Sequence, residues 1–260
     1  MNASYFTYNG IFSAVFGLKI ASFDSNTSAD ETTIFSPEIT TAKTKGMKRF
    51  YATNIDYSEP PEFDITMISE AVIPEIHKRE ILAWLNSGND FQKLEITKDG
   101  STESYYYMCK LTDIREVKVN GYCVGYTVKA VLDSYYQYGK STSVKLSNNN
   151  YTEHSISITN QSDIIDDYVY PQITFKLNNS GTIKIVNETD DSTREFIFTD
   201  IPANKEIIID NDLKIINGDG AFLSNFNKKW LRLKRGKNNL KITIDGEIEI
   251  SCPQLMCIGF

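Results

Sequence analysis

Histidine is the side chain most suited to acid–base catalysis near neutral pH, and the sequence has two, His77 and His154. His77 lies within an apolar helical pattern, and His154 lies in a polar turn before a strand. Neither belongs to a motif that would pair it with a serine or cysteine nucleophile, and the sequence has no GxSxG, Walker, GxGxxG or HExxH motif. We therefore expect a protein that is not an enzyme and has no catalytic residues.

The thiols indicate neither a metal site nor a disulfide. The four cysteines are Cys109, Cys123, Cys252 and Cys257, and no CxxC spacing or nearby histidine accompanies them. A two-residue turn at Asn120–Gly121 would place Cys123 opposite Lys118. The same register would place Cys109 opposite Leu132, so these two cysteines would not face each other. We expect four reduced thiols with mainly structural roles, as cytosolic folding favours.

Carboxylates form small groups that could in principle hold calcium or act as a glycosidase pair. The groups are Asp163 with Asp166 and Asp167, Asp190 with Asp191, Asp210 with Asp212, and the run Asn217–Gly220. Asp, Asn and Gly also build ordinary turns, and nothing in the sequence singles out one acid–base pair. We expect turns at these positions, with no metal and no cofactor.

A basic segment surrounds the second tryptophan. Between Phe226 and Lys241 the sequence has seven Lys or Arg and no carboxylate. Strand alternation would place Trp230, Arg232 and Lys234 on one face, where they could contact an acidic partner or a glycan. Alternatively Trp230 is a structural residue, and carboxylates of the next hairpin (Asp245, Glu247 and Glu249) balance a solvated basic face. The sequence leaves both interpretations open.

Composition excludes several other classes of function. The chain of 260 residues has a formal net charge of −7, which argues against stable nucleic-acid binding. Its 41% hydrophobic content is enough for one large or two ordinary domains. We also expect no secretion leader and no membrane anchor, because no charged-then-apolar leader and no long apolar run occur.

Aromatic and β-branched residues and recurring turn dipeptides predict a mainly β protein. One helix is expected at about residues 72–86, where Pro74 suits the first turn and Gly88 closes the pattern. Residues 22–62 are rich in Ser, Thr, Asp and Pro, so they form either a surface loop or an extended arm. The arm is the sharper hypothesis because a solvated loop does not need apolar residues, and this segment contains Ile39, Met47, Phe50 and Tyr51.

The composition of residues 138–150 predicts a linker or an inter-domain crossing between two domains, 1–139 and 140–260. About nine short alternating strands follow, from 155–159 to 247–250, with one at 230–233. Their period of two, with one polar face, predicts a β-sandwich.

Several short motifs, in this order, resemble those of the distal tail proteins of long-tailed bacteriophages. They are Asn9–Gly10, Phe16–Leu18, Trp84–Leu85, Tyr170–Pro171, Ile207–Asp210 and Leu233–Leu240. The resemblance implies an N-terminal β-sandwich or split-barrel-like domain with one helix and an arm, followed by a galectin-like β-sandwich. It further implies a hexameric ring at the tail tip or baseplate, through which DNA passes. Its partners would be the tail tube, tape measure and tail-associated or receptor-binding proteins.

The same resemblance implies a virion protein made in the cytoplasm of the host bacterium. The chain lacks a histidine in the strands that correspond to the sugar site of true galectins, so that site is expected to be absent. The rival hypothesis is a carbohydrate-binding or host-adhesion module that uses Trp230, and a hydrolase is a weaker third. Oligomeric state and glycan binding would distinguish them.

Overall fold

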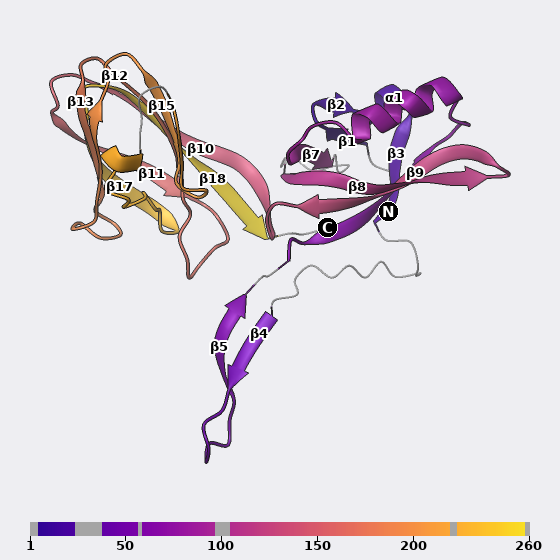
Figure 1. Cartoon of the computed structure of the whole chain (residues 1–260), viewed down its shortest axis with the longest axis horizontal. Coiled ribbons are helices and arrows are strands. Elements are labelled where there is room, and N and C mark those ends of the chain that lie inside the picture. The colour runs from indigo at the N-terminus through magenta and orange to yellow at the C-terminus, as the bar shows by residue number, and fades with distance from the viewer. Residues whose placement is uncertain (1–4, 24–37, 57–58, 97–104, 219–222, 258–260) are drawn as a thin grey trace. The chain divides into compact units, whose positions relative to one another are not determined.

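The computed structural model describes residues 5–23, 38–56, 59–96, 105–218 and 223–257 (Figure 1). The chain divides into two compact units. The first unit consists of Met1–Gln137 with Cys257–Phe260, and the second of Tyr138–Met256. Each unit has its own hydrophobic core, and strands dominate both, so the mainly β fold class is confirmed.

One antiparallel sheet forms the frame of the first unit. Its strands are β1 (Phe6–Tyr8), β2 (Ile11–Phe12), β3 (Leu18–Phe23), β6 (Glu62–Ser69), β7 (Gln92–Ile96), β8 (Tyr106–Val119) and β9 (Tyr122–Leu132). They pair in the order β2-β1-β7-β8-β9-β6-β3. Along β6, Phe63, Ile65 and Met67 are buried while the residues between them are more exposed, as period-two alternation requires.

The β8–β9 hairpin has the predicted register at both cysteines, although irregularities between Thr112 and Arg115 and between Val117 and Lys118 shift the pairing in between. Asn120 and Gly121 both have positive φ, 49° and 83°, as the commonest two-residue hairpin turn requires. Cys123 pairs with Lys118 and Cys109 pairs with Leu132, which confirms the expected separation of the two cysteines.

Helix α1 (Glu75–Leu85) packs on the first sheet through Trp84. The helix begins after Pro74 and ends one residue before the predicted end. The Trp84 ring stacks at 5.7 Å from Phe6 and 5.0 Å from Phe16, which ends the 3-10 turn η1 (Ser13–Phe16). The indole N–H donates to the carbonyl oxygen of Tyr8 at 2.9 Å. Burial of this large ring, with its polar atom satisfied, fixes the helix to the N-terminal strands.

Strands β4 (Glu38–Ala42) and β5 (Tyr51–Asp56) form a two-stranded sheet of their own, visible as a separate hairpin in Figure 1. Ile39 pairs with Ile55, and Ala42 pairs with Tyr51. Part of the predicted arm at residues 22–62 is therefore a β-hairpin. Thr33, Ile34 and Phe35 of the same segment, residue types that also favour a strand, lie outside the described residues.

The second unit is a sandwich of two sheets. Its elements are β10 (Tyr136–Asn148), β11 (Glu153–Asn160), β12 (Gln172–Leu177), β13 (Gly181–Asn187), β14 (Glu195–Ile201), β15 (Glu206–Asp210), β16 (Ile215–Asn217), the 3-10 turn η2 (Leu223–Asn225), β17 (Gly236–Thr243) and β18 (Gly246–Cys257). One sheet runs β16-β15-β12-β18-β10 and the other β11-β17-β13-β14. Their inner faces share one core, in which Phe175 of β12 meets Phe198 of β14 edge to face at 6.2 Å.

The segment at residues 138–150, expected to be a linker or an inter-domain crossing, is mostly strand β10 and not a loop, because Val144 and Leu146 alternate with exposed residues and pack against the core. One sequence prediction in this unit is wrong. The expected strand at residues 230–233 is absent. Leu231 and Leu233 are buried, as strand alternation predicts. However, the Leu231 N–H donates to the side chain of Asn211 and not to a neighbouring strand, and Leu233 pairs with Val169 in an isolated bridge.

Candidate functional site

Four buried asparagines hold the segment that carries Trp230, Arg232 and Lys234. The Asn211 amide accepts a hydrogen bond from the Leu231 N–H at 2.9 Å and donates to the Pro171 carbonyl at 2.6 Å. The remaining bonds link Asn160 to the Leu233 carbonyl, Asn187 to the Arg232 carbonyl, and Asn238 to the backbone of Lys234. Side-chain amides thus replace the strand partner that this segment lacks.

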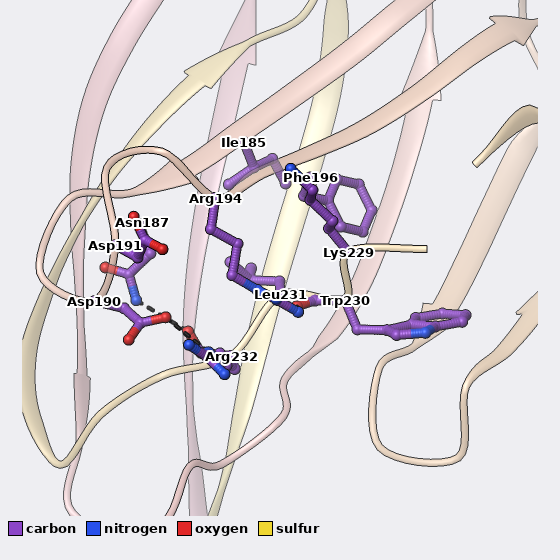
Figure 2. A pocket seen from close by; sticks show the side chains of 10 residues that line it. All are labelled: Ile185, Asn187, Asp190, Asp191, Arg194, Phe196, Lys229, Trp230, Leu231 and Arg232. Atoms are coloured by element: carbon purple, nitrogen blue, oxygen red, sulfur yellow. Dashed lines mark hydrogen bonds and ion pairs between the residues drawn. The ribbon is translucent and has the colours of Figure 1, made fainter. Parts of the chain in front are cut away.

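Asp190 organises the exposed side of the segment. Its side chain is only 4% exposed, and its carboxylate lies 2.7 Å from Arg232 Nε and 3.5 Å from Lys234 Nζ. The Arg232 guanidinium also lies 3.9 Å from the centre of the Tyr168 ring. Figure 2 shows the Asp190–Arg232 ion pair at one side of a small cavity. Two of the three predicted surface residues are therefore engaged with a carboxylate of the same unit.

The electrostatics of Asp190 favour the charged form. Burial alone would raise the pKa of this carboxyl. Hydrogen bonds from Arg232 and Tyr168, together with the charges of Arg232 and Lys234, outweigh burial and lower the pKa below its usual value. Asp190 is therefore a carboxylate throughout the neutral range, and the ion pairs persist there.

The cavity beside the ion pair is small. Its volume is about 10 Å³, and Arg194, Lys229, Trp230 and Arg232 are among its lining residues. This space admits about one water molecule and no sugar ring. The Trp230 indole points away from Asp190 in Figure 2 and packs edge to face on Phe226 at 4.7 Å. Trp230 is partly buried against the sandwich core, so its ring has a structural contact as well as a solvent-facing part.

The balance of charge around the basic segment differs from the prediction. Within the part of the chain that the structure describes, Asp245, Glu247 and Glu249 of the next hairpin form no ion pair with the segment: Asp245 accepts from Asn178 and Asn179, and Glu249 pairs with Lys145 of β10. Lys241 instead pairs with Glu153 and Glu188. Within the described ranges, four exposed cations of this segment form no ion pair, namely Lys228, Lys229, Arg235 and Lys237.

The predicted arm residues lie on the β4–β5 hairpin. Ile39, Met47 and Phe50 are 58%, 53% and 68% exposed, respectively. Lys43 Nζ lies 5.0 Å from the centre of the Phe50 ring, and Tyr51 begins β5, although its side chain is outside the described part of the structure. Three large apolar side chains are thus available to a partner.

The remaining candidate residues that the structure describes are not gathered into a site. His77 is exposed on α1, and His154 Nε2 lies 3.1 Å from the Thr152 hydroxyl. Asp210 accepts the N–H groups of Asp212 and Leu213 in an ordinary turn, and Asp219–Gly220 lie outside the described residues. Across the described ranges, no group of three or more His, Cys, Asp or Glu is arranged to hold a metal. No helix there has the length and apolarity to cross a membrane.

Sequence reasoning missed Asp190 as the partner of Arg232, because 42 residues separate them and no motif links them. It also missed the four asparagines. The one sequence signal for them is an Asn at a position where strand alternation predicts a buried apolar residue. Asn187, the last residue of β13, and Asn238, within β17, are two such positions.

The chain is a β protein of two units, and its β4–β5 hairpin has exposed apolar side chains. Residues 1–134 match a model of the phage tail protein N-terminal domain, and residues 136–252 match a model of the phage tail C-terminal domain. The chain therefore belongs to the family of phage tail proteins. Comparison with curated protein sequences finds no match.

Solved structures share the fold over nearly the whole chain. The SPP1 Dit protein (gp 19.1), described as a paradigm of the hub adsorption apparatus in phages that infect Gram-positive hosts, is similar with a TM-score of 0.63 and 14% identity, covering 98% of this chain and 99% of that one. A chain of the phage P2 baseplate in its activated conformation with Ca is similar to this chain with a TM-score of 0.58 and 8% identity. A chain of the phage p2 baseplate in its activated conformation with Sr is similar with a TM-score of 0.60 and 7% identity. Each covers 98% of both chains. The fold is thus that of Dit and baseplate proteins.

Proposed function

We propose that this chain is a structural, non-enzymatic distal tail protein that forms a hexameric ring in the phage tail tip or baseplate. The observation that carries the proposal is the fold similarity to SPP1 Dit over 98% of this chain, together with the two phage tail family matches. The ring would join the tail tube and tape measure proteins to tail-associated or receptor-binding proteins. It would belong to the virion after synthesis in the host cytoplasm.

In this proposal the two domains have different tasks. Residues 1–139 form the ring, and residues 140–260, a galectin-like sandwich, project outward. A closed ring needs heterologous contacts, in which a donor surface on one subunit meets a different surface on the next. The exposed Ile39, Met47 and Phe50 supply such a donor surface. Residues 1–139 contain 13 Lys and Arg against 18 Asp and Glu, and an acidic channel wall would let DNA pass without adhering.

Light scattering coupled to size-exclusion chromatography tests the ring. The expected mass is six times the 29.5-kDa chain mass, and negative-stain images are expected to show a ring with a central channel. A monomer at every concentration, also in the presence of the tail tube protein, would contradict the proposal.

The carbohydrate-binding alternative has less support from the site. Arg232 and Lys234 are held by Asp190, and the adjacent cavity of about 10 Å³ admits no sugar ring. Binding of a purified saccharide that is lost in Trp230→Ala would reverse this ranking.

A further inference from the structure

The end of the β4–β5 hairpin combines strong positive charge with apolar side chains. We name residues Lys43–Phe50 the cationic tip. Within it, the Met47 N–H donates to the Thr44 carbonyl at 3.0 Å, and Gly46 has φ +96°, so the chain reverses in a β-turn with glycine at its third position. The described side chains of the tip are all exposed, and its cations are Lys43, Lys45, Lys48 and Arg49.

The tip differs in charge from the rest of the chain. Four cations lie within seven residues and no carboxylate lies between them, whereas the whole chain has 27 Lys and Arg against 34 Asp and Glu. Without these four, the formal net charge would be −11. Among the described residues the four cations form no ion pair, and Met47 and Phe50 are 53% and 68% exposed. Exposed cations beside exposed apolar side chains fit a partner surface that is both acidic and apolar.

The second unit carries a surface of that composition. We name residues Ile165–Asp167 and Asp210–Ile215 the acidic face. Ile165 and Leu213 are 70% and 68% exposed, although both are large aliphatic residues. Asp210 pairs with Gln172 across β15 and β12, and Asn211 bonds the Pro171 carbonyl, which brings the loop after β15 to the segment that precedes β12.

Carboxylates are the sequence neighbours of these two apolar residues. They are Asp166, Asp167, Asp210 and Asp212, against one cation, Lys214. Partial removal of the Asp212 carboxyl from water, the charge of Asp210 and, more weakly, the charge of Asp167 raise the pKa of Asp212, so Asp210 and Asp167 lie within electrostatic reach of it. A cation from a partner would relieve this repulsion.

We propose that the cationic tip of one copy docks onto the acidic face of a second copy of this chain. Lys45 and Lys48 would meet carboxylates such as Asp166 and Asp212, while Met47 and Phe50 would cover Ile165 and Leu213. The argument is complementarity of charge and of apolar surface on a single chain, which is what a heterologous contact between identical subunits requires. The inference rests on the proposed ring and adds to the contacts among residues 1–139 a contact from the hairpin of one copy to the sandwich domain of another.

A protein partner fits the tip better than DNA does. Phosphate contacts use cations and hydrogen-bond donors, and they leave Met47 and Phe50 without a role. The remaining chain, at a net −11, would also be repelled by DNA.

Cross-linking tests the contact in the full chain. A photoreactive benzophenone amino acid replaces Phe50, and illuminated samples contain equal amounts of isotopically light and heavy chains. We expect light–heavy cross-links to peptides that contain Ile165 or Leu213. Cross-links confined to one chain, or directed to other surfaces, would overturn the proposal.

Charge reversal gives an independent test. The variant Lys45→Glu/Lys48→Glu is expected to weaken self-association about tenfold or more, and adding Asp166→Lys/Asp212→Lys is expected to restore most of the loss. The matched control is Lys140→Glu/Lys176→Glu, which reverses two exposed cations elsewhere in the second unit that form no ion pair with a described residue and is expected to leave association within about threefold of the wild type.

The outcomes separate this inference from the proposed function. If the wild type forms the ring and the tip variant forms it equally well, only the docking contact is wrong. If the wild type is a monomer, the ring itself is refuted. If the wild type retards a DNA duplex in a gel and the tip variant does not, the tip is a nucleic-acid contact and the docking proposal fails.

Discussion

Replacing Trp230 with alanine separates a structural role from an exposed sugar platform. A fully buried tryptophan costs about 3–5 kcal/mol when it is truncated to alanine. Trp230 is only partly buried, with one edge-to-face contact to Phe226 at 4.7 Å, and such a pair contributes about 0.5–1.5 kcal/mol. We therefore expect Trp230→Ala to lower the free energy of unfolding of the second unit by about 2–3 kcal/mol.

The two tryptophans make the measurement specific to each unit, because Trp84 lies in the first core and Trp230 against the second. In urea titrations of Trp230→Ala, the far-UV circular dichroism transition of the second unit should move to lower urea. The fluorescence of Trp84 should report an unchanged midpoint for the first unit.

The control is Trp84→Ala. Trp84 is 4% exposed, stacks on Phe6 and Phe16 and donates to Tyr8, so its loss should cost about 4–6 kcal/mol in the first unit. A change below about 0.5 kcal/mol in Trp230→Ala, accompanied by loss of saccharide binding, would refute the structural role.

Three further predictions concern local chemistry. The pKa of Asp190 is lower in the folded chain than the ordinary 3.8, so its stabilisation is present above about pH 4 and is lost as pH falls through the folded value. Asp190→Asn should cost about 1–3 kcal/mol at pH 7 and progressively less as the pH falls below about 4, and a loss independent of pH would contradict the ion-pair account. Burial raises the pKa of Cys109 and of Cys252 to about 12, and Cys257 is the exposed thiol. Iodoacetamide at about pH 8 should therefore modify Cys257 alone in the native chain and all four thiols in urea, which mass spectrometry can check. Modification of Cys109 in the native chain would refute its burial. Because β10 is a paired strand, trypsin should cleave slowly after Lys140 and Lys145, and early fragments ending there would restore the linker.

Local patterns in the sequence determined much of this fold. The two-residue turn specifies the β8–β9 register next to the turn. Farther along β8, two irregularities shift the pairing by one residue and back again, so Cys109 still pairs with Leu132 as counting from the turn predicts. The apolar face around Trp84 predicted α1, and alternation predicted the inner faces of the sandwich. Each of these features depends on residues close together in the chain.

Only the tertiary structure decided the rest, because it depends on pairs that are distant in sequence. The Ser and Thr residues of β10 are typical of a linker. The segment is a strand because it pairs in a sheet whose inner face places Val144 and Leu146 against the core. Trp230 and its neighbours form no strand because Asn211, about 20 residues earlier, takes the Leu231 N–H. The sequence alone predicts Arg232 as a free surface cation. In the folded chain its Nε lies 2.7 Å from the carboxylate of Asp190, because burying a carboxylate is costly unless a cation pairs with it.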